Sequence, residues 1–479
     1  MTLNTPPHIP VCRLGRSYTS LDRAKVVDGR TGDTLATVSQ ANAGLIRRDL
    51  RRMAEAREQL RRRPCRDVLD ICARAGELFL NANLPLGDNG SVQSPQQYVA
   101  ALSASSGLPH VLCRQNMAKI HTVLTRMESI LLGLTRGLAT DVIDAGLGEQ
   151  AGVAVSFTET TEALGAVLPS NSPGVNSIWL PAVALKIPVA IKPGRDEPWT
   201  PLRIIQALMA AGYPREAFGF YPTDHEGADA ILTGCGRSIL FGDDATIGRY
   251  AGDERVQLHG TGRSKIILGP DRVDDWRDVL DVILSSILDN GGRSCVNASC
   301  IIVPKHADEI ADALAKRLTG VAPRPADDTD ARLAAFVNPR IAVAIDGAIE
   351  AGLATGGAAD ITARHRRGPR RLTFDRLTYL LPTIVRCDCF DHPLANAEFL
   401  FPFASVVQMS IDAAIDHLGP TLVATVITDD DALADRFVRC PSIDRLNLGA
   451  IPTTRVAWDQ PHEGNLFEFL YRRRAVQTA

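Results

Sequence analysis

From about Ala154 onward, short apolar strands alternate with amphipathic helices. The stretch "EALGAVLPSNSP" predicts a strand that runs into a loop, "PVAIKPG" a second strand, and "PLRIIQALMAAGYP" a helix closed by Gly212 and Pro214. "SILFGDDATIGRYAG" again predicts a strand and then a helix. This βαβ alternation is typical of a doubly wound sheet with mainly parallel strands, so the fold class is α/β.

A second α/β unit follows. "KIILG" and "SCIIVPK" predict strands, with helices over "DDWRDVLDVILSSILDNGG" and "ADEIADALAKRLTGV", and further strands at "TYLLPTIVR" and "ASVVQMS". Between Leu45 and Leu138, apolar residues at three- and four-residue spacing predict helices, with a loop at "LPLGDNGSVQSPQQY". A chain of 479 residues is too long for one core, so we expect two or three packed units.

The composition excludes several classes of protein. A net charge of −3 gives no general signal for binding a polyanion, and the arginine-rich "LIRRDLRRMAEAREQLRRRPCRD" has the interspersed acids and leucines of a solvated helix. No apolar run is long enough for a membrane span, and the N-terminus lacks the pattern of a secretory signal. Ten scattered cysteines fit a reducing compartment, so we expect a cytoplasmic protein without nucleic-acid or membrane partners.

The stretch "NGGRSCVNASC" leaves the role of Cys295 open between a packed thiol, a metal ligand and a nucleophile. Packing alone favours a buried, inert cysteine. Zinc is not expected in the chain, because the pair Cys387 and Cys389 is too closely spaced and has no matching second pair. "HGTGRSKIILG" lacks the third glycine of the usual dinucleotide fingerprint and leads into a strand, so it predicts a tight turn.

The order of five short sequence blocks decides between these roles for Cys295. "LPSNSPG", "AIKPGRDEPWTP", "QLHGTG", "NGGRSC" and "AEFLFPF" follow one another along the chain at plausible separations. The sequence here resembles the aldehyde dehydrogenase superfamily, whose corresponding blocks are Pro-x-Asn-x-Pro, Lys-Pro-Ser-Glu, Glu-Leu-Gly-Gly, Asn-x-Gly-x-x-Cys and Glu-x-Phe-Gly-Pro. The resemblance covers roughly residues 154–407, and "DRLNLGAIPT" is similar to the late strand and loop of the family.

The resemblance implies a domain arrangement. Residues 1–263 would hold the N-terminal helices and a Rossmann-type NAD(P)-binding domain, with a small oligomerisation hairpin near 140–162. Residues 264–445 would form the catalytic domain that carries Cys295, and 446–479 a C-terminal return segment. A homodimer or homotetramer is the expected assembly.

The resemblance also assigns roles to single residues. Cys295 would attack an aldehyde carbonyl as a thiolate, because an aldehyde has no leaving group until a covalent thiohemiacetal has formed. Asn171 would donate to the resulting oxyanion. Lys192 would bind the adenosine ribose of the cofactor, Glu398 the nicotinamide ribose, and Gly248 would lie in the cofactor site. Cys300, five residues after Cys295, is expected to be packed.

One departure from the family concerns the base that activates water. The register "VQLHGTG" places Gln257 where hydrolytic members have a glutamate, and an amide cannot accept a proton. Members that act on acyl-CoA also lack this base and pass the acyl group to a thiol. The sequence therefore favours interconversion of an aldehyde and an acyl thioester, with coenzyme A as a possible co-substrate. His259, two residues later, is the candidate for a replacement base.

Further departures concern the cofactor. Arg195 stands where many NAD-specific members have a glutamate, and an arginine attracts a 2′-phosphate, so NAD or NADP is expected with a slight preference for NADP. Asp196 and Glu197 adjoin Arg195 and weaken that preference. Asp243 and Asp244 are good helix N-caps but would repel a pyrophosphate placed beside them.

The expected function is thus that of an NAD(P)-dependent oxidoreductase acting on a small aldehyde or acyl thioester. A hydrolytic aldehyde dehydrogenase that yields the free acid is the close alternative. A cysteine acyltransferase without nicotinamide is the alternative from another class, and a non-catalytic scaffold is a third. Lys192 and Glu398 argue against the acyltransferase, and the Asn171–Cys295 pair argues against the scaffold.

Overall fold

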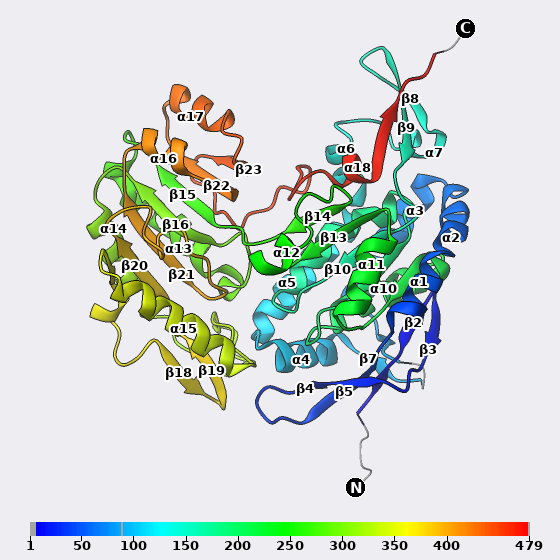
Figure 1. The fold of residues 1–479 in the computed structure, drawn as a ribbon, viewed down its shortest axis with the longest axis horizontal. Helices are drawn as coiled ribbons and strands as arrows, with labels where there is room; N and C mark the ends of the chain where they lie inside the picture. The colour runs from blue at the N-terminus through cyan, green and yellow to red at the C-terminus, as the bar shows by residue number, and fades with distance from the viewer. Residues whose placement is uncertain (1–5, 88–89, 478–479) are drawn as a thin grey trace.

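The computed structural model describes residues 6–87 and 90–477 and divides them between two lobes (Figure 1). Each lobe is built on a seven-stranded sheet, and a small three-stranded sheet projects from the first lobe. The α/β class and the Rossmann-like architecture expected from the sequence are confirmed. None of the helices in the described ranges combines the length and the apolar character needed to cross a membrane.

The sheet of the first lobe has the order β14-β13-β10-β11-β12-β2-β3. Its parallel strands are β10 (Leu164–Val167), β11 (Val189–Lys192), β12 (Phe218–Phe220), β13 (Arg237–Phe241) and β14 (Val256–His259). The antiparallel edge consists of β2 (Val11–Arg13) and β3 (Arg16–Tyr18). The chain runs outward from β10 through β11 and β12, then returns to the other side of β10 with β13. This reversal is the topological switch point where open α/β sheets bind ligands.

Helices of the first lobe pack on both sides of this sheet. They are α1 (Ala43–Leu50), α2 (Met53–Arg61), α3 (Cys65–Asn81), α4 (Pro95–Ser106), α5 (His110–Thr125), α6 (Met127–Leu134), α8 (Asn176–Trp179), α9 (Pro181–Ala184), α10 (Trp199–Ala210) and α11 (His225–Gly234). The helical block expected between Leu45 and Leu138 is therefore present. The expected loop inside it is partly wrong, because Ser94 and Gln97 form a capping box that starts α4 there. That loop also contains β6 (Leu84–Pro85) and β7 (Val92–Gln93), while residues 88–89 lie outside the described residues.

The sheet of the second lobe has the order β17-β20-β21-β16-β15-β22-β23. Its strands are β17 (Ala358–Asp360), β20 (Thr383–Cys387), β21 (Phe403–Gln408), β16 (Ala298–Val303), β15 (Ser264–Leu268), β22 (Thr421–Ile427) and β23 (Ile443–Leu448). Helices α13 (Leu280–Leu288) and α14 (Ala307–Leu318) cover one face. Helices α15 (Pro339–Ala354), α16 (Ile411–His417) and α17 (Asp431–Val438) cover the other. Ile266 and Ile267 in β15 point to opposite faces, because successive strand residues alternate.

The single strand expected over "TYLLPTIVR" is wrong. Leu377–Leu380 (β19) pairs with Arg371–Phe374 (β18) as a separate hairpin, and β20 begins only at Thr383. Pro382 lies between them and has no backbone N–H to continue a ladder. Alternation of apolar residues along the segment does not reveal this break.

The C-terminal segment leaves β23 in the second lobe and crosses back to the first, where α18 (Leu466–Leu470) and β24 (Tyr471–Arg474) follow (Figure 1). β24 pairs with β9 (Val153–Glu159), which forms a hairpin with β8 (Leu147–Gln150) after the short helix α7 (Asp141–Ala145). β23 extends to Leu448, three residues beyond the boundary at 445 expected from the sequence. Strands β1 (His8–Ile9), β4 (Arg23–Val27) and β5 (Thr34–Ser39) form one more small sheet that the sequence analysis did not predict.

Candidate active site

The loop before Cys295 has an unusual backbone. Asn290, Gly291 and Gly292 all have left-handed φ angles, of 52°, 64° and 68°. A Cβ on Gly292 would collide with the backbone of Phe401, so a glycine is required there. The Asn290 side chain ties the loop to its surroundings, because Nδ2 donates to Ser172 Oγ (3.1 Å) and to Ser294 Oγ (2.9 Å). Close contact at Gly292 and the two hydrogen bonds of Asn290 therefore fix the conformation of this loop.

Cys295 lies at the junction of the two lobes and is only partly buried. The Ser264 hydroxyl donates to its carbonyl oxygen at 2.9 Å. A Cβ on Gly262 would collide with that same carbonyl, so the turn between β14 and β15 has to approach the loop without a side chain. Cys300 instead lies fully buried in β16 among apolar side chains, as expected.

Asn171, on the loop after β10, reaches the nucleophile loop. Its Nδ2 donates to the Arg293 carbonyl oxygen at 2.9 Å. An amide nitrogen has two hydrogens, so the second remains available to an oxygen bound near Cys295. The geometry thus brings the expected oxyanion donor and the expected nucleophile to one wall of a cavity.

Two neighbouring cavities form a groove at the carboxyl ends of the parallel strands. The inner one, of about 490 Å³, is lined by Asn171, Cys295 and Glu398 among others. The outer one, of about 580 Å³, is lined by Lys192 and Arg195. Both cavities are lined by Pro169, Ser170 and Phe241, which follow or end β10 and β13. The groove therefore lies at the switch point of the sheet, where a dinucleotide fits.

The residues expected to bind a cofactor occupy different parts of this groove. Lys192 ends β11, and burial lowers the pKa of its ammonium group. Glu398 accepts from the Arg263 backbone N–H at 2.6 Å, and burial raises its pKa to about 7. Gly248, at the end of α12 (Asp244–Gly248), is not among the residues that line either cavity. Its expected role in cofactor binding stays a prediction.

The acidic residues near the groove are partly engaged elsewhere. Glu197 accepts from the Thr200 backbone N–H (2.8 Å) and hydroxyl (2.6 Å), so it caps α10 inside the protein. Asp244 forms an ion pair with Arg263 at 2.6 Å. Asp243 caps α12 and also lines the inner cavity. Of the four acids Asp196, Glu197, Asp243 and Asp244, Asp196 and Asp243 are thus the ones that line the groove.

A comparison of the sequence with family models gives one match that spans most of the chain. The model described as "Aldehyde dehydrogenase family" matches residues 17–464. The chain belongs to the aldehyde dehydrogenase family. Among curated proteins, it is 26% identical over 289 residues to the N-succinylglutamate 5-semialdehyde dehydrogenase of Vibrio cholerae, covering 56% of this chain and 57% of that protein. It is 24% identical over 261 residues to the mitochondrial aldehyde dehydrogenase of Leishmania tarentolae, covering 51% of this chain and 50% of that protein.

The chain thus spans about half the length of the curated relatives it matches. Solved structures match over nearly the whole fold. Aldehyde dehydrogenase C from Pseudomonas syringae superposes with a TM-score of 0.78 at 17% identity, covering 98% of this chain and 96% of that one. A 3,6-anhydro-L-galactose dehydrogenase gives 0.78 at 15% identity, with coverages of 98% and 99%. At such identities the likeness establishes the fold of this aldehyde dehydrogenase family member.

The Cys295 thiol of this family member is strongly held in its protonated form. Burial raises its pKa to about 12, and the nearby Glu398 carboxyl acts in the same direction. Lys119 and Arg445 act in the opposite direction but do not outweigh burial. Since the thiolate is the reactive form of a cysteine, a nucleophilic role for Cys295 requires that this proton first leaves the sulfur.

The C-terminal segment supplies a residue that the sequence analysis missed. Glu463 Oε1 lies 3.7 Å from Cys295 Sγ, and its other carboxylate oxygen contacts His259 Nδ1. Gln257 Nε2 donates to the Glu463 backbone carbonyl. His259 itself is buried and stacks on Phe241, with ring centroids 4.5 Å apart. No local sequence signal marks Glu463, because its role depends on a contact across 168 positions.

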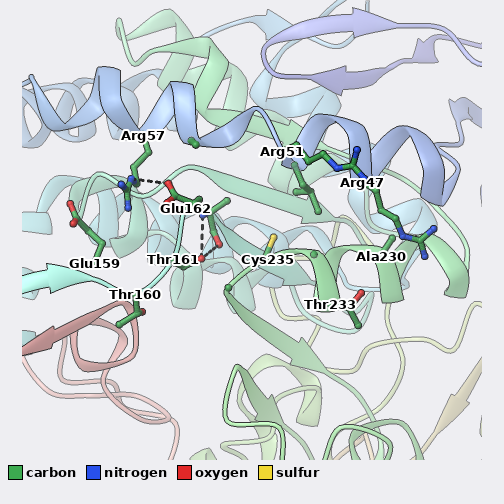
Figure 2. Close-up of a pocket in the computed structure, with 15 residues that line it drawn as sticks. Arg47, Arg51, Arg57, Glu159, Thr160, Thr161, Glu162, Ala230, Thr233 and Cys235 are labelled. Atoms are coloured by element: carbon green, nitrogen blue, oxygen red, sulfur yellow. Dashed lines mark hydrogen bonds and ion pairs between the residues drawn. The ribbon is translucent and has the colours of Figure 1, made fainter.

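A second hollow, of about 640 Å³, lies away from this site, beside α1, α2 and α11 (Figure 2). Arg57 and Glu162 form an ion pair there at 3.0 Å. Cys235 lines it but is buried, and burial raises the pKa of its thiol to about 12. Over residues 6–87 and 90–477, no three His, Cys, Asp or Glu side chains gather in a way that suits a metal ion.

The contact between Gly262 and the nucleophile loop generates a prediction. Gly262→Ala should lower turnover about a hundredfold, because the new Cβ displaces the Cys295 carbonyl and a shift of about 1 Å in a reacting group has that order of effect. Gly347→Ala is the control, since its Cβ would meet open space on α15. Steady-state rates of both variants check this, and an unchanged rate in Gly262→Ala would contradict the close approach.

Proposed function

We propose that this chain oxidises an aldehyde with NAD(P)⁺ through a covalent bond to Cys295. The observation that carries the proposal is that Cys295 and Asn171 line one cavity, which continues into the groove at the switch point. Structural neighbours support it. The indole-3-acetaldehyde dehydrogenase structure is complexed with NAD⁺, and that of aldehyde dehydrogenase C from Pseudomonas syringae is complexed with NAD⁺ and octanal.

Each of the residues named at this site has a role in the proposed reaction. Cys295 Sγ releases its proton to solvent and bonds to the aldehyde carbon, whose C=O π electrons move to oxygen and leave a thiohemiacetal oxyanion. The free N–H of Asn171 Nδ2 and the Cys295 backbone N–H hold that oxygen, and one such donor is worth about 2.7–4 kcal/mol. A bound NAD(P)⁺ would supply the acceptor for the hydride that leaves this carbon when the oxyanion collapses, and Cys295 would then carry a thioester. Glu398 and Lys192 would hold the two riboses from the wall of the groove.

Removal of the nucleophile should abolish the reaction. Cys295→Ala should reduce aldehyde-dependent NAD(P)H formation to background while cofactor binding persists, because the hydride donor is the thiohemiacetal. Cys389→Ser is the matched control, since Cys389 is exposed. Absorbance at the wavelength of the reduced nicotinamide measures the first property and fluorescence titration the second. A Cys295→Ala variant with near-normal turnover would reject the assignment.

Two acceptors for the acyl group are compatible with this chemistry. Gln257 at the position of the usual base favours a thiol such as coenzyme A, and the product would then be an acyl thioester. Glu463 beside the sulfur favours water, and the product would then be the free acid. Product analysis with and without coenzyme A distinguishes the two. An acyltransferase without nicotinamide remains the alternative of another class, and it predicts no hydride transfer at all.

The outer cavity favours NADP over NAD. Lys192, Arg195 and Arg249 all line it, and Glu197 points away from it into the α10 cap. Guanidinium groups bind phosphate well, because their fixed N–H groups match its oxygens.

Arg195→Glu should weaken NADP binding by about tenfold or more and NAD binding much less. A hydrogen bond to a charged group contributes roughly 1.5–3 kcal/mol, and the new carboxylate would repel the 2′-phosphate. Dissociation constants for both cofactors, measured by fluorescence, check this. Equal losses for NAD and NADP would show that Arg195 does not face the phosphate.

The β8–β9 hairpin supports a homodimer or homotetramer. Leu147 and Val153 in it are 44% and 64% exposed, and β8 forms the outer edge of its sheet. An unpaired edge with exposed apolar side chains is a template for pairing with a second copy. Leu147→Lys, on the β8 edge itself, should therefore lower the molar mass measured by light scattering at a given concentration. An unchanged mass would exclude this edge as the interface.

All ten cysteines are free, which supports a reducing compartment such as the cytoplasm.

A further inference from the structure

The crossing segment between β23 and α18 is fixed firmly at the site. Arg445 in β23 donates to the Arg455 carbonyl (2.9 Å) and contacts His462 Nδ1 (3.0 Å). Asn465 donates to the Leu134 carbonyl at 2.8 Å and caps α18. Glu463 lies between these attachments, and its side chain is only 10% exposed. Its position beside Cys295 is therefore built by contacts to both lobes.

The Glu463 carboxylate reaches two functional groups at once. One oxygen lies 3.7 Å from Cys295 Sγ, and the other contacts the His259 ring, which is 1% exposed. Gln257 donates to the Glu463 backbone and so helps to place it. Gln257, which stands where hydrolytic family members have a glutamate, thus helps to hold the segment that carries the Glu463 carboxylate.

We propose that Glu463 is the general base that activates water to release the acyl group from Cys295, with His259 as its positioning residue. The proposal rests on the proposed function, since it needs an acyl-Cys295 to act on. It makes the free acid the product.

Release of the acyl group consumes one water molecule and needs no other reactant. Glu463 takes a proton from a water molecule, and the water oxygen bonds to the thioester carbon. The carbonyl oxygen carries the negative charge, held by Asn171. When it collapses, the C–S bond breaks, the acid leaves, and the Cys295 thiolate recovers the proton from Glu463. No electrons are exchanged in this half of the reaction.

His259 and Glu398, which line the inner cavity itself, fit this role less well than Glu463, which approaches the sulfur from two smaller neighbouring cavities. Burial lowers the pKa of His259 to about 3, so its ring is neutral at physiological pH and can donate from Nδ1 to the carboxylate. The ring is too weak a base to act alone. Glu398 lines the same cavity as Cys295, but its carboxylate already accepts from the Arg263 backbone N–H at 2.6 Å, whereas Glu463 Oε1 lies 3.7 Å from the sulfur.

The test is Glu463→Gln, which keeps the size of the side chain and removes its basicity. A general base contributes about a hundred- to ten-thousandfold. The variant should therefore show a burst of NAD(P)H equal to the enzyme concentration, followed by a steady state at least about a hundredfold slower than wild type. Intact-protein mass spectrometry should show an acyl adduct. Glu468→Gln is the control, because Glu468 is exposed on the same segment.

Three outcomes separate the proposals. A burst and an acyl adduct in Glu463→Gln support the assignment. Linear turnover at the wild-type rate, without an adduct, overturns it, as does loss of the burst in a folded variant, because the affected step would then precede the acyl-enzyme. If the wild-type enzyme itself reduces no NAD(P)⁺ with any aldehyde of a panel, the proposed function fails. Decay of the isolated acyl-enzyme, measured directly, gives a second reading that is independent of hydride transfer.

Discussion

The close approach of the β14–β15 turn to the nucleophile loop determines the rest of the site. Gly262 allows the turn to contact the Cys295 carbonyl, and Ser264 donates to the same oxygen. This turn is also where the chain passes from the first lobe to the second, so the backbone that joins the two sheets also sets the position of the sulfur. Asn171 from the first lobe can reach the loop of the second only because this distance is short.

The position of Cys295 and Glu398 at this junction also explains their raised pKa values. Closing the lobes around Cys295 removes water, which raises the pKa of the thiol and of Glu398 together. Glu463, fixed between His259 and the sulfur, is the group that we propose to activate water at this junction. Under that proposal, it acts only after the acyl group is bound to Cys295.

Much of the fold and of the candidate site could be predicted from the sequence. The βαβ alternation follows from local periodicity, and Cys295 and Asn171 from short motifs in a fixed order. The structure brings these two residues together as expected. The break at Pro382 was missed because alternation continues on both sides of it, and β1 because a strand of two residues carries no periodicity and depends on its pairing with β5. Glu463 was missed because its importance depends on the lobes being closed around it.

The path of the C-terminal segment has a consequence for synthesis on the ribosome. Cys295, Asn171 and the whole groove are made before Glu463, and the chain emerges from its N-terminus. A nascent chain that ends at Gly449 would already hold the Cys295 thiol and all strands of both seven-stranded sheets, yet would lack Glu463 and leave β9 without its partner β24. The last part of the chain to be translated therefore brings both the proposed base and the strand that pairs with β9.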